Sequence, residues 1–227
     1  MKLIITRPKQ DCATIADALR ERGHDVTLAP LIKIEPRTNV EFPDLPYQAV
    51  CLTSANAARH LPAGVSRDLS AFVLGAQSAA AAIGAGFVHV EAKGGNVEGL
   101  AANMKKFLRP ERGPILYVSG NETSGDLAGA LTASGFLVSK VITYDAVPQT
   151  LTLSAEEVAM FDGVLLYSRR TARIWAQEIQ RLMLLPRLSH FCLSSQIIDA
   201  LPEQWRRHAA LEPTETSLLA MIDLVAK

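Results

Sequence analysis

The sequence predicts an α/β protein with two parallel-sheet domains joined by a pair of crossing strands. Short apolar, β-branched runs alternate with segments of helical spacing, which is typical of parallel sheets covered by helices on both faces. A strand–helix–strand unit at the start of the chain recurs in its middle, which indicates a second domain of the same kind. Of the 227 residues, 48% are hydrophobic, so the chain can bury a sizeable core.

The apolar runs predict the strands, and the segments between them predict the helices. The expected strands are Lys2–Thr6, Asp25–Ala29, Ala49–Thr53, Ala71–Leu74, Val88–Glu91, Pro114–Val118, Val138–Ile142, Gly163–Tyr167, Ser189–Leu193 and Ala209–Leu211. A first helix is expected from the helical spacing of Cys12, Ile15, Ala16 and Leu19, ending at Gly23. The other expected helices are Ala55–Leu61, Gln77–Ile83, Val97–Leu108, Thr123–Ser134, Thr171–Leu184, Gln196–Leu201 and Glu215–Val225.

The internal repeat supports the two-domain prediction. Aligning residues 3–26 with residues 116–138 places Leu19 on Leu131 at an offset of 112 (131 − 19), with a glycine stop kept in both copies. A second pair, LTSANAARH (52–60) and LYSRRTARI (166–174), matches at an offset of 114, as 168 − 54 shows. Each member of this pair follows an apolar run and starts a helix at a serine, so each serine is a candidate helix cap.

Two β-branched stretches that end in proline are expected to cross between the domains. They are APLIKIEPRT (29–38) and VITYDAVPQT (141–150), and neither is followed by a helical pattern. We expect them to pair as a short ladder. One domain then comprises residues 1–35 and 147–227, and the other is the continuous insertion 36–146.

Charge and targeting signals narrow the function classes. Lys plus Arg (23) equals Asp plus Glu (23), which argues against general nucleic-acid binding, where a basic surface supplies most of the affinity. The N-terminal residues lack the apolar region of a secretory signal, and no apolar run approaches the roughly 20 residues that span a bilayer. The three isolated cysteines are expected in the core. We therefore expect a cytoplasmic protein without a nucleic-acid or membrane partner.

Small and hydroxylic residues follow most of the predicted strands. In open parallel α/β sheets, ligands bind beyond the carboxyl ends of the strands, and helix starts there favour anions. Helix capping alone also predicts such residues at any single position, but two domains with one row each favour an anion-binding role for the set. The candidate binding residues are Arg7, Thr53, Ser54, Ala55, Asn56, Gly75, Ser78, Gly120, Asn121, Ser168, Arg169, Ser194 and Ser195.

The sequence contains few residues in patterns that indicate catalysis. The five histidines show no metal-ligand spacing, and CxxC, HExxH, GxSxG and nucleotide-binding glycine motifs are absent from the sequence. Tyr144 stands apart, because it lies in the second crossing stretch and a phenol can donate a proton without a metal. An aromatic residue that only packs on the ladder is an equally good interpretation of its position.

Seven stretches follow one another over nearly the whole chain: ITRP, LTSANAA, VLGAQSAAAAIGAGF, GGNVEGLA, ILYVSGNETSGDLAGAL, VITYDAVP and LLYSRRTARIW. In this order they resemble the uroporphyrinogen-III synthase family of tetrapyrrole (haem, porphyrin) biosynthesis. The resemblance implies two flavodoxin-like domains joined by a two-strand ladder. It also implies a lyase that cyclises hydroxymethylbilane to uroporphyrinogen III, with loss of water and inversion of ring D.

The resemblance implies no metal or other cofactor, a monomer, and a linear tetrapyrrole polycarboxylate as the substrate, with the preceding enzyme of the pathway as a candidate partner. It makes Tyr144 the candidate catalytic residue, which assists departure of the substrate hydroxyl. Ser78 stands where many members have Thr, and Ser194–Gln196 departs from the family's GPxT turn, which puts the binding role of that turn in doubt. The alternative prediction is a non-catalytic two-domain module of the same fold that binds anions or tetrapyrroles.

Overall fold

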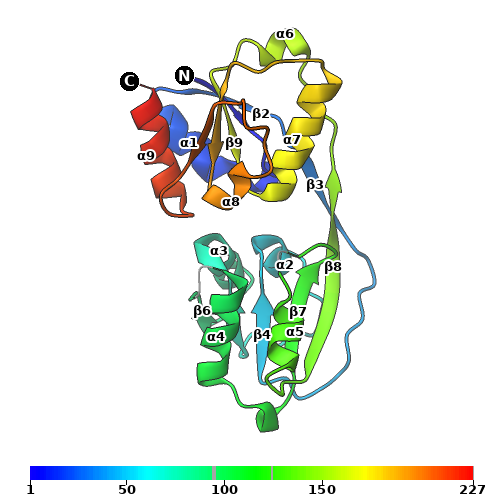
Figure 1. Ribbon diagram of the computed structural model, residues 1–227. Coiled ribbons are helices and arrows are strands. Elements are labelled where there is room, and N and C mark those ends of the chain that lie inside the picture. Colours follow the sequence, from blue (N-terminus) through cyan, green and yellow to red (C-terminus); the bar gives the residue numbers. More distant parts are fainter. Residues whose placement is uncertain (94–95, 124, 227) are drawn as a thin grey trace. The chain divides into compact units, whose positions relative to one another are not determined.

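The computed structural model of the chain describes residues 1–93, 96–123 and 125–226 (Figure 1). Its internal contacts divide it into two units, one formed by Met1–Lys33 with Val147–Lys227 and the other by Ile34–Ala146. The sequence predicted a first unit that breaks off after residue 35 and a second unit that ends at residue 146. In the structure, these boundaries fall after residue 33 and after residue 146. The chain thus enters the second unit once and leaves it once, through strands β3 (Ile32–Pro36) and β8 (Val138–Pro148).

The first unit contains a five-stranded sheet with the order β11-β10-β9-β1-β2. Its neighbouring strands pair in parallel. The strands are β1 (Lys2–Ile5), β2 (Asp25–Leu28), β9 (Gly163–Leu166), β10 (Ser189–Cys192) and β11 (Arg207–Ala209). Because β2 lies on one side of β1 and the later strands lie on the other, the direction of winding reverses between β1 and β9.

In the described part of this unit, five α-helices connect or follow these strands. They are α1 (Ala13–Glu21), α6 (Ala155–Val158), α7 (Arg169–Arg181), α8 (Ser195–Ile198) and α9 (Glu215–Val225), with a short 3₁₀ turn at Lys9–Asp11. Helices α1 and α9 pack together on one face of the sheet, where Ile15, Leu19, Leu218 and Ile222 surround Leu3 in one apolar cluster. Figure 1 shows these two helices side by side.

The second unit contains a six-stranded sheet with the order β3-β8-β7-β4-β5-β6. The remaining strands are β4 (Ala49–Leu52), β5 (Ser70–Val73), β6 (Val90–Glu91) and β7 (Ile115–Gly120). The pairings from β8 through to β6 are parallel, and β3 and β8 form the ladder of crossing strands. Here the winding reverses between β4 and β7.

Both faces of the second sheet are covered, which explains the unbroken apolar run of β4. Ala49 and Cys51 pack toward α4 (Val97–Phe107) and α5 (Leu127–Thr132). Val50 and Leu52 pack on the other face, toward α2 (Ala55–Arg59) and α3 (Gly75–Gly84). Since side chains alternate along a strand, a doubly covered strand must be apolar at every position. A 3₁₀ turn at Pro110–Arg112 precedes β7.

The predicted fold class is confirmed, while several element boundaries were wrong. The helix predicted at Thr123–Ser134 begins only at Leu127, because Asp126 caps it by accepting from the Gly129 amide at 2.9 Å. Gly120 and Asn121 therefore do not lead directly into a helix. Gly94, Gly95 and Ser124 of the quoted segments lie outside the described residues.

Two further elements differ from the prediction. The last strand lies at Arg207–Ala209 and not at Ala209–Leu211, since its register pairs His190 with Arg207. Helix α6 was missed, although Ser154 and Glu157 form a capping box whose Ser-x-x-Glu pattern is visible in the sequence.

The described residues also bear on the cysteines, on metal binding and on membrane spans. Cys12, Cys51 and Cys192 are buried free thiols, as the sequence predicted. Within the described ranges, no group of three or more His, Cys, Asp and Glu residues is arranged to hold a metal ion. None of the helices in this part of the chain is both long and apolar enough to cross a bilayer.

Candidate functional site

Several candidate residues lie close together in the second unit, at the point where the winding of the sheet reverses between β4 and β7. Ligands of open α/β sheets bind beyond the strand ends at such a reversal. Thr53 and Ser54 follow β4, Gly120 ends β7, and Tyr144 lies opposite Gly120 on β8. The sheet order therefore gathers residues that are up to 91 positions apart in sequence (144 − 53) at one edge.

Ser54 and Tyr144 are in direct contact. The Ser54 hydroxyl caps α2 by accepting a hydrogen bond from the Ala57 amide at 3.0 Å. The same hydroxyl shares a hydrogen bond of 2.8 Å with the Tyr144 phenol. Tyr144 is 7% exposed, so its ring is buried among the residues that pack against α2 and α3. The predicted cap at Ser54 is confirmed, and the cap also contacts the candidate catalytic phenol.

A β-bulge in β8 directs Tyr144 toward this edge. Ser119 pairs with Ile142, but the next residue, Gly120, pairs with Tyr144, so Thr143 is the extra residue of the bulge. Bulges bend a strand locally and re-aim its side chains, and they are frequent near active sites. Val141 and Tyr144, three positions apart, consequently pack in the same apolar cluster, although residues an odd number of positions apart lie on opposite faces of a regular strand.

Gly120 makes room for the tyrosine. A Cβ atom at this position would lie 2.6 Å from the Cε2 and Cζ atoms of the Tyr144 ring. Such a distance is well inside van der Waals contact, so the ring could not keep its place beside any larger residue. The next residue, Asn121, donates its amide to the Tyr144 carbonyl at 3.0 Å and holds the backbone of the bulge.

The opposite face of the same edge carries a second phenol. The Thr53 hydroxyl and the Tyr117 phenol are 3.3 Å apart. Burial raises the pKa of Tyr117, and the bond to Thr53 only partly opposes this shift, so Tyr117 is a neutral phenol at physiological pH. Thr53 lies on the same face of the sheet as Cys51, and Ser54 lies on the same face as Leu52. The two phenols therefore pack on opposite faces of the sheet.

His60 also lies near the candidate catalytic residue. The centroids of the His60 and Tyr144 rings are 6.1 Å apart. Partial burial and the neighbouring Arg59 both lower the pKa of His60, which favours the neutral imidazole at pH 7. The carboxylate beside Tyr144, that of Asp145, is paired with Arg37 through two bonds of 2.8 Å. The hydrogen bond from Arg37 lowers the pKa of Asp145, so this carboxyl group is ionised and is already paired with Arg37.

The remaining candidates of the second unit lie on α2 and α3. Ala55 and Asn56 open α2 and are buried, and the Asn56 side chain accepts from Arg59 at 2.9 Å. Gly75 opens α3 with a φ of +80°, and the space where its Cβ would lie is open. Ser78 is only 4% exposed, one turn inside α3. Of these residues, Gly75 leaves its backbone most accessible to a ligand.

In the first unit, Ser168 repeats the geometry of Ser54. Its backbone angles of −152° and 155° match the −151° and 157° of Ser54. Its hydroxyl accepts from the Thr171 amide at 3.1 Å and shares a bond of 2.8 Å with the Thr171 hydroxyl. The predicted cap at Ser168 is confirmed. Ser168 thus shares its hydrogen bond with the Thr171 hydroxyl, whereas Ser54 shares its own with the Tyr144 phenol.

The other candidates of this unit have partners within the chain. Arg7 is ion-paired with Glu215 and lies over the Tyr167 ring, 4.4 Å from its centroid. Arg169 donates to the Gln196 carbonyl at 3.0 Å. Ser194 precedes α8 without a side-chain cap bond, and Ser195 opens that helix on the surface. These residues share the strand-end edge of the first sheet, as expected, but both arginines already have protein partners.

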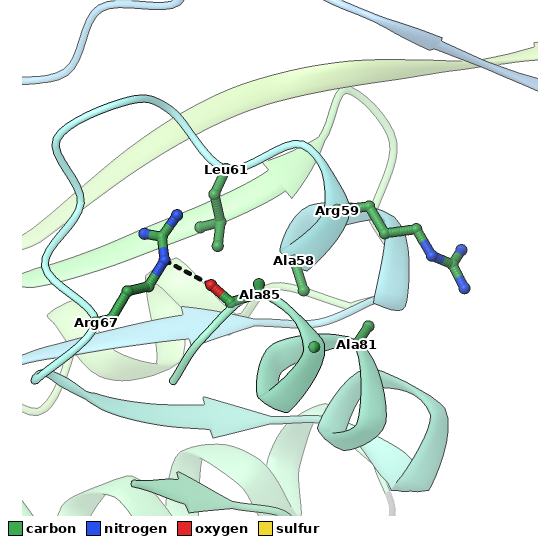
Figure 2. Close-up of a pocket in the computed structure, with 7 residues that line it drawn as sticks. Ala58, Arg59, Leu61, Arg67, Ala81 and Ala85 are labelled. Atoms are coloured by element: carbon green, nitrogen blue, oxygen red, sulfur yellow. Dashed lines mark hydrogen bonds between the residues drawn. The ribbon is translucent and has the colours of Figure 1, made fainter. Parts of the chain in front are cut away.

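A pocket of about 470 Å³ lies between α2 and α3, apart from these residues (Figure 2). Its lining is mostly small, with Ala58, Ala81 and Ala85. Figure 2 shows the Arg67 side chain on the Ala85 carbonyl, to which it donates at 2.8 Å. Arg67 also donates to the Val65 carbonyl at 2.6 Å, so its guanidinium links Val65 to the C-terminal end of α3. This pocket contains none of the candidate site residues.

Comparison with known protein families gives one match that covers most of the chain. The family model described as uroporphyrinogen-III synthase HemD matches residues 13–220. The chain belongs to the uroporphyrinogen-III synthase family. Curated protein sequences give no match.

Solved structures of uroporphyrinogen III synthases share its fold. The enzyme from Helicobacter pylori is 15% identical with a TM-score of 0.61, and the match covers 100% of both chains. A mutant form of the enzyme from the thermophilic bacterium Thermus thermophilus is 12% identical with a TM-score of 0.53, covering 100% of this chain and 99% of the other. At these identities the likeness supports the fold alone.

Two residues of this candidate site were not among the sequence candidates. Tyr117 lies within a predicted strand, where nothing in the sequence distinguishes it from a core residue, and it is buried in the core. His60 ends the quoted stretch LTSANAARH, but a lone histidine carries no signal until the fold brings it near Tyr144. Only the order of the strands reveals either contact.

Proposed function

We propose that this protein is a uroporphyrinogen-III synthase, a lyase that cyclises hydroxymethylbilane to uroporphyrinogen III in porphyrin and haem biosynthesis. The family match over residues 13–220 supports this proposal. The single structural observation that favours catalysis over mere binding is the buried Tyr144 phenol, held by Ser54 at 2.8 Å at the reversal of the second sheet.

The proposed reaction loses one water and needs no redox step. The terminal hydroxymethyl group of the linear tetrapyrrole accepts a proton from Tyr144 as its C–O bond breaks, and the lone pair of the adjoining pyrrole stabilises the cation that forms. A spiro intermediate then forms, fragments and recloses with ring D inverted. The ring carbon that forms the last bond releases a proton, which restores the phenol.

The substrate carries eight carboxylates, and we propose that the strand-end rows of both units bind them. Amides at helix starts hold anions without a large net positive charge, which agrees with a chain of balanced charge. Gly75, Ser168 and Ser195 have the most suitable positions, because each opens or caps a helix at a sheet edge. Pyrroles are electron-rich, so positioning and charge stabilisation carry most of the catalysis.

The experiment that tests this proposal supplies freshly made hydroxymethylbilane and separates the product isomers. Hydroxymethylbilane closes on its own to isomer I, so formation of isomer III requires an enzyme. We expect isomer III as the main product. Isomer I alone, at the rate without protein, would contradict the proposal and favour a non-catalytic tetrapyrrole-binding module.

A further inference from the structure

The proposed reaction needs a group that accepts a proton as well as one that donates it. The hydroxyl group leaves from the terminal carbon of the substrate, whereas the last proton leaves from the ring carbon that closes the macrocycle. These are different atoms, and a general base must come within about 3 Å of the group whose proton it takes, or reach it through one water. A second proton-transfer group beside Tyr144 would meet this need.

His60 is a side chain of the right kind beside Tyr144. Its ring centroid lies 6.1 Å from that of Tyr144, and the two ring planes are tilted by 45°. The backbone amide of His60 donates to the Asn56 carbonyl at 3.0 Å, which fixes the residue at the end of α2. His60 is only partly buried, so part of its surface stays open to a ligand.

The surroundings of His60 suit a base. Among the described residues, neither ring nitrogen has a hydrogen-bond partner, so a lone pair stays available to accept a proton. The charged group that acts on the imidazole is Arg59 on α2, and the titratable group packed against it is Tyr144 on β8. Partial burial, and then Arg59, lower the pKa of His60, so the imidazole is neutral at physiological pH.

The other four histidines do not lie beside the candidate catalytic phenol. His24, His190 and His208 belong to the first unit. His89 belongs to the second unit but is exposed, which makes it a suitable control. The position of His60 is therefore specific to this edge of the second sheet.

We propose that His60 is the base that takes the proton from the closing ring carbon and passes it to the Tyr144 oxygen. This inference rests on the proposed function and adds a second catalytic residue to it. In the first step the phenol proton leaves with the hydroxyl as water, and the phenol becomes a phenolate. After the last carbon–carbon bond forms, the ring carbon gives its proton to the neutral imidazole, and the electron pair of the C–H bond returns to the pyrrole. The imidazolium then protonates the phenolate, directly or through one water, so both groups end as they began.

The test compares His60→Phe and His60→Gln in the full protein by the rate of isomer III formation from hydroxymethylbilane. Phenylalanine keeps an aromatic ring against Tyr144 but has no nitrogen, and glutamine keeps a polar side chain that takes up no proton. We expect both variants to lower kcat about 100-fold. His89→Gln should leave kcat unchanged. A His60→Phe protein with the kcat of the parent would show that the ring only packs, and would overturn the inference.

The pH dependence of kcat/KM is a readout that packing alone would not change. Because the imidazole must be neutral to accept a proton, kcat/KM of the parent should fall in acid as His60 becomes protonated. The midpoint of this fall should lie below 6.5, the ordinary pKa of histidine, since burial and Arg59 lower the pKa of His60. His60→Gln should lose this acid limb, and Tyr144→Phe should keep it. An acid limb that survives unchanged in His60→Gln would contradict the inference.

The inference and the proposed function fail in different ways. If the parent protein forms no isomer III, the proposed function is wrong and the role of His60 is overturned with it. If the parent forms isomer III and His60→Phe changes only KM, the proposed function stands, but His60 binds substrate without accepting a proton. Urea unfolding of each variant establishes that folded proteins are compared, and His60→Gln decides the result if the phenylalanine variant does not fold.

Discussion

The place of Tyr144 depends on a residue that has no side chain. Gly120 pairs with Tyr144 across the bulge, and the ring occupies the volume that a Cβ at position 120 would need. Tyr144 in turn reaches Ser54 at 2.8 Å, so a displacement of the ring breaks this hydrogen bond. At this scale the site depends on steric fit as much as on chemical groups.

Replacing Gly120 by alanine therefore should impair both stability and catalysis. A methyl group 2.6 Å from the Tyr144 ring must push the ring or β7 aside. We expect the free energy of unfolding to fall by about 1–3 kcal/mol, as for other overpacked sites. We also expect kcat to fall at least 10-fold, since displacements of about 1 Å at reacting groups are costly. Denaturant unfolding and steady-state kinetics on the folded variant measure the two effects.

Gly84→Ala is the matched control for that substitution. Gly84 ends α3, and a Cβ there would meet no atom within 4 Å. Alanine in this helix should leave kcat unchanged and keep or slightly raise stability. If Gly120→Ala behaved like this control, Tyr144 would not be held by close packing against β7.

At the scale of the element, strand β10 carries a buried histidine that links stability to pH. His190 is fully buried, stacks on Trp205 with ring centroids 4.7 Å apart, and has its Nδ1 3.0 Å from the Arg206 carbonyl oxygen. Burial lowers the pKa of His190 to about 4 from an ordinary value of 6.5. The folded protein thus holds this imidazole neutral in a range where the unfolded chain binds a proton.

This histidine should make the protein less stable in mild acid. Because the pKa is lowered on folding, its contribution is complete above about pH 6.5 and is lost as the pH falls toward 4. The free energy of unfolding should decrease by up to about 1.4 kcal/mol per pH unit from this group. Urea unfolding at pH 7 and pH 5 measures the difference. His190→Phe, which keeps an aromatic ring beside Trp205, should reduce that difference, and an unchanged difference would refute the assignment.

The elements themselves could largely be predicted from the sequence, because apolar runs and helical spacing mark them. The caps at Ser54 and Ser168 followed from the same patterns, and the structure confirms both. The bulge at Thr143 could not be predicted, because it arises from the pairing of β8 with β7 and not from local propensity. The helix start was predicted too early, at Thr123, although Asp126, which caps the helix in the structure, is also a favoured capping residue.

The site contacts depend on strand order, which the sequence does not specify. Tyr117 meets Thr53 only because β7 lies next to β4, and His60 nears Tyr144 only because α2 packs on the face of the sheet where Tyr144 lies. The row of strand ends was nevertheless a useful prediction, since parallel strands bring their carboxyl ends to one edge. Whether each residue of that row binds substrate stays a prediction.

At the scale of the whole molecule, two sheets each offer one reversal of winding and one row of helix starts. The chain has balanced charge, 23 basic against 23 acidic residues, and the proposed function therefore assigns the attraction for a polycarboxylate to amides at helix starts. We propose that the row of helix starts in each unit binds carboxylates of the substrate. The first unit can be tested at Ser195, the exposed first residue of α8.

A negative charge at Ser195 should weaken substrate binding without harming the fold. Aspartate is favourable at the start of a helix, so Ser195→Asp should be as stable as the parent protein. Its carboxylate would repel the substrate, and we expect KM to rise about 5-fold or more while kcat changes little, since roughly 1 kcal/mol of repulsion suffices. Ser195→Asn, which is similar in shape but neutral, is the control. Equal KM values for the two variants would exclude the first unit's α8 from the binding surface.

The most direct test of the account is the fraction of isomer III formed from hydroxymethylbilane as the concentration of protein is raised. Closure without enzyme gives isomer I, so the two routes compete for the same substrate in one vessel. We expect the fraction of isomer III to rise from near zero toward completeness, and Tyr144→Phe to require about 100 times more protein for the same fraction. Isomer I as the sole product at every protein concentration would contradict it.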